Sequence, residues 1–191
     1  MVGCPIVGDG EAEVGSLILS LRYYQLDMLL QGFFVRGAIS VGNNYMDNEI
    51  VFGDALMEAY DTEQSMARDP RIVLAKSAKQ LVRKHLKFYG KVKDSPQHDT
   101  LLLDTDGQWF IHYLGVLNED DPSEVDLTRL EAHKALAEAR LHSFANQPTI
   151  WSKYAWVANY HNFFCSEQGN TLNEYRIPQN LIRLRPSRIS G

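Results

Sequence analysis

The sequence predicts an α+β fold in which helices cover a mostly antiparallel sheet and a helical hairpin is appended at the C-terminal end. Three observations carry this prediction. Short β-branched and aromatic runs alternate with amphipathic segments in the first 120 residues, turn-forming residues separate them, and residues 121–191 contain two long segments of helical spacing. The expected order begins strand, helix, strand, strand, helix, strand.

Size and charge limit the class of protein. The 191 residues suit one continuous core. The net charge of −5 argues against broad binding of nucleic acid or of an anionic membrane, although a solvated basic tail is expected after Glu174. Cys4 and Cys165 lack CxxC spacing, which indicates a reducing cytoplasm, and no apolar run is long enough to span a bilayer.

The first half contains the most distinctive pattern. Residues 2–7 read as a short strand, and helical spacing from Val14 predicts a helix that Gly32 ends. Its expected apolar face continues through Leu17, Ile18, Leu21, Tyr24 and Met28. The run 33–41 is predicted to pair with 49–52 across a turn at 42–48, and Gly53 then leads into a helix with Asp54 as its N-cap.

The second half predicts a strand at 70–74, a helix at 76–87, an exposed loop at 91–99 and a hairpin around Asp106-Gly107. Pro122 and Ser123 are expected to open the next helix, where Ser123 and Asp126 have capping-box spacing. Its expected apolar face comprises Leu127, Leu130, Ala137, Leu141 and Phe144. An aromatic helix follows from Thr149. We assign residues 1–120 to a core and residues 121–191 to a helical hairpin and basic tail packed on it.

The junction at Gly53 raises the question of phosphate binding. A helix N-terminus offers free backbone N–H groups to an anion, but the Asp54 carboxylate competes there and favours simple N-capping. Neither GxxxxGK[ST] nor GxGxxG occurs. Arg36 falls in the middle of the predicted strand, where it is expected to lie at a sheet edge, to pair with a carboxylate or to face an anionic ligand. Asn43, Asn44 and Tyr45 are turn formers that contact a nucleotide only if one docks beside them.

Other polar residues favour structural interpretations. Glu58 and Glu63, five positions apart, are expected at the surface or an interface. The segment DTDG between two strands indicates a turn rather than a metal site. His161 and Cys165 have i and i+4 spacing, and helix packing is favoured over a nucleophilic pair. Core or dimer-interface roles are expected for the aromatic residues Trp151, Tyr154, Trp156, Tyr160 and Phe163.

The segments "VRGAISVG" and "IVFGDALMEAYDTE" resemble the middle of class III nucleotide cyclases. The chain more closely resembles the pyrimidine (uridylate or cytidylate) cyclases of the Pycsar antiphage system. The blocks "FFVRGAISVG", "FGDALMEAY", "PRIV", "DGQWFIHYL", "HKALAEARL" and "KYAWVANYHNFF" resemble that family's blocks in the same order. The resemblance extends over residues 3–184.

The resemblance implies a cyclase-type α/β sandwich that works as a head-to-tail homodimer with active sites at the interface. Such an enzyme binds a nucleoside triphosphate with two divalent metal ions, Mn²⁺ or Mg²⁺. The 3′-hydroxyl attacks the α-phosphorus, pyrophosphate leaves, and a 3′,5′-cyclic nucleotide forms. The expected substrate is UTP rather than CTP, and the cyclic product is an antiviral messenger for a separate effector. Arg36 would meet phosphate, and Asn43, Asn44 and Tyr45 would contact the nucleotide.

Two departures from the family pattern concern catalysis. The family's two metal-binding aspartates precede the segment matched by residues 2–7, so no metal ligand is assigned here and residues 1–120 are expected to form a truncated core of little or no activity. Purine cyclases carry an Asn and an Arg where this chain has Met57 and Asp61. Both departures agree with a divergent pyrimidine cyclase and with a non-catalytic dimerisation or nucleotide-binding module. A third hypothesis is an interaction protein that uses its C-terminal aromatic hairpin.

Overall fold

A computed structural model describes residues 2–47, 49–118 and 124–182. The chain divides into two compact units, Met1–Val116 and Leu117–Gly191. The α+β class is confirmed, and the sheet is small and mixed. Among the described helices, none has both the length and the apolar character needed to cross a membrane.

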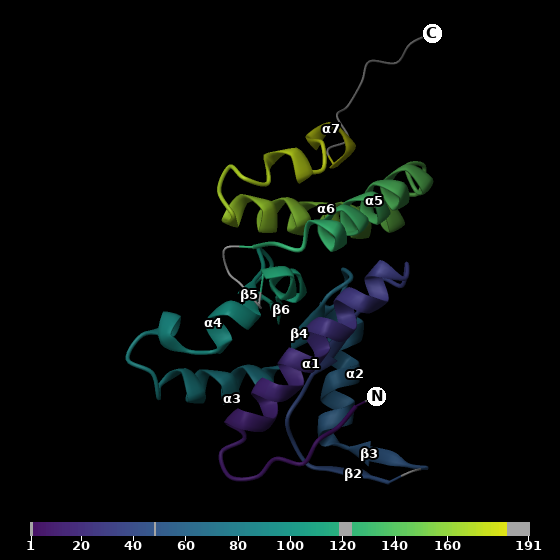
Figure 1. Ribbon diagram of the computed structural model, residues 1–191. Helices are drawn as coiled ribbons and strands as arrows, with labels where there is room; N and C mark the ends of the chain where they lie inside the picture. Colours follow the sequence, from purple (N-terminus) through teal and green to yellow (C-terminus); the bar gives the residue numbers. More distant parts are fainter. Residues whose placement is uncertain (1, 48, 119–123, 183–191) are drawn as a thin grey trace. The chain divides into compact units, whose positions relative to one another are not determined.

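The first unit contains short strands and helices of very different lengths (Figure 1). Its helices are α1 (Glu11–Leu30), α2 (Asp54–Met66), α3 (Lys76–Leu86) and α4 (Gln97–Thr100), with the 3₁₀ turns η1 (Val92–Asp94) and η2 (Tyr113–Asn118), the latter crossing into the second unit. Its strands are β1 (Gly37–Ile39), β2 (Asn44–Met46), β3 (Val51–Gly53), β4 (Ile72–Leu74), β5 (Leu101–Leu103) and β6 (Trp109–Ile111).

The main sheet has the order β1-β4-β6-β5. Strand β1 runs parallel to β4, with Gly37 opposite Ile72, whereas β4–β6 and β5–β6 are antiparallel. The predicted pairing of 33–41 with 49–52 is therefore wrong. Strand β3 pairs instead with β2, which lies inside the predicted turn. All three residues of β4 are buried, so β4 offers β1 a fully apolar neighbour that the exposed hairpin does not.

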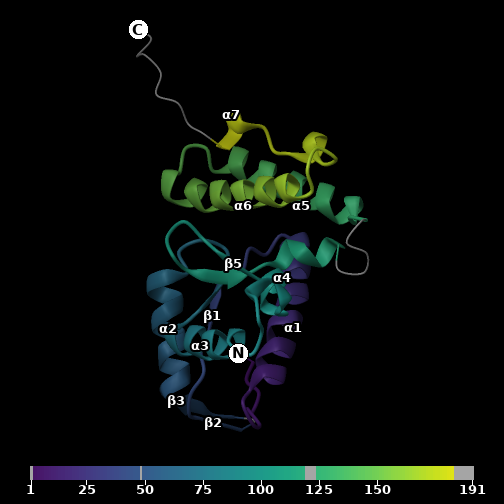
Figure 2. The ribbon, with the colours of Figure 1, turned by 90° about the vertical axis from the view of Figure 1, so that its left-hand side faces the viewer.

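Helices α1 and α2 lie on opposite sides of β1 (Figure 2). The core joins α1, α3 and the sheet, and its buried members are Val14, Ile18, Ile39, Ile72, Leu74, Ala78, Val82 and Ile111. The predicted helix α1 is confirmed, but its buried face turns away from Tyr24, which is 49% exposed. Arg22 and Gln25 are buried instead, because Arg22 Nε donates to His112 O at 2.9 Å and Gln25 Nε2 to Pro70 O at 3.2 Å.

Two further expectations for this unit are corrected. Residues 2–7 form no strand, and Val2, Ile6 and Val7 are exposed. An apolar run becomes a strand only where another strand pairs with it, and none does here. The segment 91–99 is not a uniformly exposed loop, because it forms η1 and the start of α4 and buries Ser95 and Gln97. The predicted β4, α3 and β5–β6 hairpin are confirmed.

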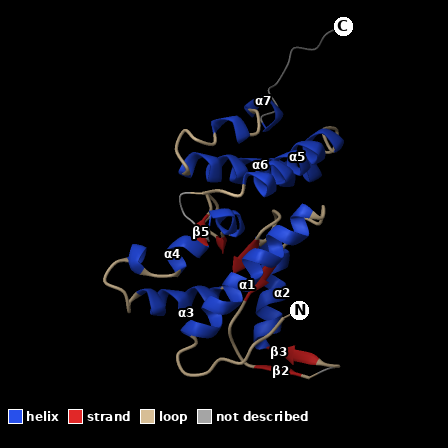
Figure 3. Cartoon of the chain, in the orientation of Figure 1, coloured by secondary structure: helices blue, strands red, loops and turns tan. Residues whose placement is uncertain are grey.

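The second unit consists of helices and loops in its described part (Figure 3). It contains α5 (Leu127–Ser143), α6 (Pro148–Glu167), the 3₁₀ turn η3 (Asn173–Tyr175) and α7 (Gln179–Ile182). The helical hairpin α5–α6 is confirmed. Helix α5 begins later than predicted, because the Asp126 side chain caps it by accepting from Arg129 N at 3.0 Å. Leu127 is 41% exposed rather than buried. Pro122, Ser123 and the arginines of the basic tail after Ile182 lie outside the described residues.

Candidate functional site

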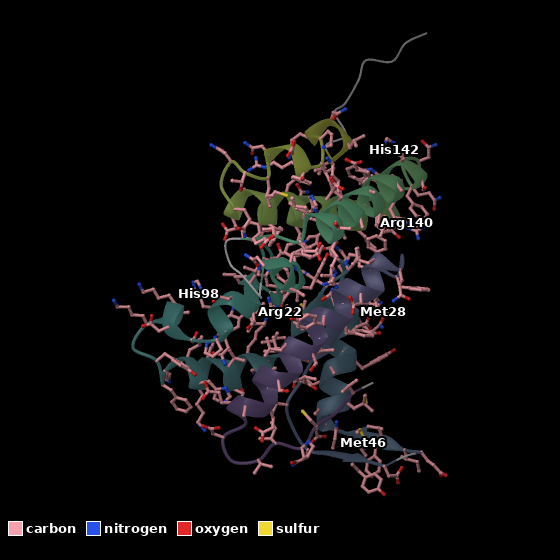
Figure 4. The ribbon with its side chains drawn as sticks, viewed as in Figure 1. Arg22, Met28, Met46, His98, Arg140 and His142 are labelled. Atoms are coloured by element: carbon pink, nitrogen blue, oxygen red, sulfur yellow. The ribbon has the colours of Figure 1, made fainter. Side chains whose placement is uncertain are left out.

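The candidate site is the segment between β1 and α2, residues 40–54, which carries three of the four predicted site residues. Ser40 follows β1, and its hydroxyl donates to Ala55 O at 2.5 Å, which ties this segment to the start of α2. The next glycine, Gly42, lies against Ala55. The chain then enters the β2–β3 hairpin, where Figure 4 labels Met46.

The junction between β3 and α2 requires glycine at position 53. Gly53 has φ 147°, and a Cβ there would lie 2.4 Å from both Asn43 O and Asn44 Oδ1. The predicted N-cap is corrected at the same point. Asp54 is the first residue of α2 and its side chain caps nothing, whereas Asn44 Oδ1 accepts from Leu56 N at 3.1 Å. The Asn44 side chain, which comes from β2, thus provides an acceptor for one of the N–H groups in the first turn of α2.

We expect Gly53→Ala to lower the free energy of unfolding by roughly 2 kcal/mol, because alanine must leave the positive φ and displace the Asn43 and Asn44 backbone. Gly15→Ala in α1 is the control. Its added Cβ meets nothing within 4 Å, so the change should stabilise by up to about 1 kcal/mol through helix propensity. Urea unfolding of both variants measures the difference, and equal midpoints would contradict the strained junction.

The tip of the hairpin is organised by Asp47. Its Oδ1 accepts from Glu49 N at 2.8 Å and Ile50 N at 2.7 Å, and its Oδ2 accepts from the Tyr45 hydroxyl at 2.8 Å. The hydrogen bonds to Glu49, Ile50 and Tyr45 lower the pKa of Asp47, and the bond to Asp47 raises the pKa of Tyr45. The Tyr45 ring stacks on Phe52 with centroids 5.1 Å apart, and half of Tyr45 remains exposed.

Arg36 lies immediately before β1, not within it, and it has a carboxylate partner. Its Nε is 2.5 Å from Glu63 Oε1 on α2, with both side chains partly exposed. Asn44 contacts Leu56, seven residues before Glu63, which is about 10 Å along the helix axis. The structure therefore holds Asn43, Asn44 and Tyr45 together at one end of α2 and Arg36 near the other.

Helix α2 is also joined to α3 through Glu58. Its carboxylate accepts from Ser77 N at 3.0 Å and from the Ser77 hydroxyl, and Ser77 Oγ in turn accepts from Val41 N at 2.8 Å. This connection ties the segment after β1 to two helix N-termini. Glu58 and Glu63 thus have partners within the unit while both stay partly exposed, so their predicted surface or interface role stays a prediction. Spacing along one helix gives no sign of such partners, because both come from other elements.

The DTDG turn binds a buried arginine. Arg71, 1% exposed, donates to Asp104 and Asp106 through both terminal nitrogens and lies over the Phe110 ring at 5.9 Å. Burial raises the pKa of Asp106, but the hydrogen bonds from Arg71 and from the Gln108 N–H outweigh it and leave that pKa lowered. Burial raises the pKa of nearby Asp69. The two carboxylates of the turn neutralise the guanidinium.

The second unit contains a buried histidine pair. His133 Nδ1 and His161 Nδ1 are 3.0 Å apart, and His161 Nε2 is 2.9 Å from Tyr175 O. Burial lowers the pKa of His161 to about 4, and burial together with His161 lowers the pKa of His133 well below 6.5. Cys165 Sγ lies 3.6 Å from His161, and burial raises the pKa of its thiol to about 11. Cys165 is fully buried, which agrees with the predicted core or helix-packing role.

The residues of the candidate site do not fit the two divalent ions that the resemblance implies. The Asp47 carboxylate is occupied by the turn, and Asp9, in the turn before α1, accepts from Glu11 N at 3.2 Å. Across the described ranges, no three His, Cys, Asp or Glu side chains form a group able to hold a metal ion. Met57 and Asp61 are exposed on α2.

Comparisons with protein-family models, with curated proteins and with solved structures find no match. The functional assignment therefore depends on the residues of this chain.

Proposed function

We propose that the chain is a nucleotide cyclase-type domain for a pyrimidine nucleoside triphosphate, with UTP preferred over CTP and a 3′,5′-cyclic nucleotide and pyrophosphate as products. The junction at Gly53 is the observation that carries the proposal. The Gly-Asp pair of the resembling motif stands where a strand passes directly into a helix, and only glycine fits there. The backbone geometry of this chain thus explains why glycine stands in the motif. The motif also keeps its place in the order of the sequence blocks that resemble the cyclase family.

The exposed side chains around that junction suit a nucleotide. Asn43 offers an amide for a base edge, and Tyr45 offers a half-exposed ring on which a base can stack. Arg36 would contribute to phosphate binding after exchanging its partner Glu63 for the more highly charged ligand.

We further propose that two copies associate through the hairpin and α2, with the nucleotide sites at the interface. Six large apolar side chains on these elements are at least half exposed: Tyr45, Met46, Ile50, Phe52, Met57 and Tyr60. Scattered apolar residues are normal on a surface, but this set comes from one hairpin and the helix that follows it. The cyclic product would then carry the signal to a separate effector.

Nucleotide binding and turnover test the proposal directly. The chain is titrated with UTP, CTP, ATP and GTP in Mn²⁺ by calorimetry, and products are identified by mass. We expect UTP to bind at least tenfold more tightly than ATP, with little cyclic UMP formed because Met57 and Asp61 cannot orient ribose and phosphate. Tyr45→Ala should weaken UTP binding. The control is Tyr24→Ala, an exposed tyrosine on α1. Equal affinity for all four nucleotides, or none for any, would overturn the proposal.

The second candidate is a non-catalytic dimerisation or nucleotide-binding module. The pairing of Arg36 with Glu63 favours it, because the cation assigned to the phosphate already has a partner. This candidate predicts a dimer that binds nucleotide and yields no cyclic product under any metal condition. A cyclic UMP or cyclic CMP peak would exclude it.

A further inference from the structure

The strongest charge asymmetry of the described chain lies on α3 and the turn after it. Residues 76–93 contain seven basic residues and no acid, in a chain whose net charge is −5. These residues are Lys76, Lys79, Arg83, Lys84, Lys87, Lys91 and Lys93. Helix α3 buries Ala78, Val82 and His85 on its other face, so the cations point away from the core.

Two of the cations are committed to the fold. Lys79 Nζ donates to Gln108 Oε1 at 2.6 Å, and Arg83 lies over the Trp109 ring at 5.3 Å. The four lysines at the end of α3 and in the turn after it are not committed in this way. Lys84, Lys87, Lys91 and Lys93 are all exposed, and none of their ammonium groups forms a hydrogen bond or ion pair with any residue that the structure describes. Their charge is therefore available to a partner.

Two apolar side chains lie among these lysines. Phe88 is 55% exposed and Val92 is 56% exposed. We call Lys84, Lys87, Phe88, Lys91, Val92 and Lys93 the basic patch. It occupies the end of α3 and the turn that leads to α4, the segment that extends farthest to the left in Figure 1. Acids beside the patch are Asp94, which follows it, and Glu11, which accepts from the Tyr89 hydroxyl at 2.6 Å.

We propose that the basic patch binds an anionic membrane surface. Lysines are attracted to anionic headgroups, and their long stems let Phe88 and Val92 reach the boundary with the acyl chains. The composition favours a bilayer over nucleic acid, because the cations of the patch are all lysines, the neighbouring Arg83 lies over the Trp109 ring, and the valine offers nothing to a base. The net charge of −5 argues against broad attraction to such a surface, but a local cluster of lysines responds mainly to charges within about 10 Å at physiological salt.

Vesicle flotation with the whole chain tests the proposal. The probes are vesicles of phosphatidylcholine alone and of phosphatidylcholine with about one third phosphatidylglycerol, a fraction chosen on the order of cellular anionic surfaces. We expect binding to the anionic vesicles only, and weaker binding at high salt. Lys87→Gln/Lys91→Gln should reduce that binding roughly 30-fold, because each lysine near an anionic surface contributes about 1 kcal/mol of attraction. Phe88→Ala should reduce it several-fold.

Matched controls separate the patch from general charge effects. Arg68→Gln/Lys76→Gln removes the same charge from exposed positions outside the patch, and Phe33→Ala removes an aromatic side chain that is 59% exposed elsewhere. Both should bind like the unaltered chain, with circular dichroism confirming the fold of every variant. Equal binding to neutral vesicles, equal loss in control and patch variants, or binding to a single-stranded RNA oligonucleotide without binding to vesicles would each overturn the proposal.

Discussion

Replacing both Asp104 and Asp106 by asparagine should lower the free energy of unfolding of the first unit by about 3 kcal/mol. The change leaves the Arg71 guanidinium, 1% exposed, without the two carboxylates that it contacts. A buried cation that loses these carboxylates is still desolvated, but the attraction that offset the desolvation is gone. Asparagine keeps the shape of the turn, so the loss measures charge rather than packing.

Tryptophan fluorescence during urea unfolding gives the measurement. In a Trp151→Phe/Trp156→Phe background the remaining tryptophan, Trp109 on β6, reports on the first unit. The control is Asp94→Asn/Asp99→Asn, which removes two exposed carboxylates and should change stability by less than about 0.5 kcal/mol. Equal effects of the two double variants would mean that Arg71 does not depend on the turn.

Acid should destabilise the second unit through the His133–His161 pair. The Tyr175 carbonyl accepts from His161 Nε2, so a neutral His161 accepts at Nδ1 the proton that His133 Nδ1 donates. A second proton on His161 would place two N–H groups face to face. The pKa of His161 is about 4 in the folded chain, against 6.5 ordinarily. The unfolded chain therefore takes up the proton first as pH falls.

The stabilisation is complete above pH 6.5, is lost between pH 6.5 and about 4, and changes no further below that for His161. For this residue alone the loss is about 3 kcal/mol, and His133 acts in the same direction. His133→Leu/His161→Gln should flatten the profile, since glutamine still donates to Tyr175 O. His142→Gln, an exposed histidine on α5, is the control and should keep the slope. Urea unfolding in a Trp109→Phe background at several pH values measures it, and an unchanged slope in the double variant would contradict the pairing.

Local patterns allowed much of the fold to be predicted. Helix α1, helix α3 and the β5–β6 hairpin each depend on neighbours close in sequence, so apolar spacing and the Asp106-Gly107 turn were sufficient. The pairing of β1 was missed, because partner choice depends on what lies alongside a strand in space. A three-residue strand such as β1 or β2 carries too little periodicity to reveal it.

In the candidate site, too, features set by sequence neighbours could be predicted and contacts between distant residues could not. The requirement for glycine before α2 follows from the sequence, whereas the cap from Asn44 and the pairing of Arg36 with Glu63 do not. The link from Glu58 to Ser77 joins side chains 19 positions apart. Nothing in spacing along one element identifies such a contact. Arg71 was not singled out either, although a charge beside an apolar run such as IVL signals a buried partner.

The parallel ladder between β1 and β4 also determines the order in which the first unit is assembled. Gly37 lies opposite Ile72 and Leu101 opposite Ile111, so β1 must close a loop more than three times longer than the β5–β6 hairpin does. That difference costs about 1 kcal/mol of chain entropy before any contact compensates it. The hairpin can therefore form early and β1 joins late. Ser40 and Val41 follow β1 directly, so we expect their contacts with Ala55 and Ser77 to form late, whereas the β2–β3 hairpin can form on its own.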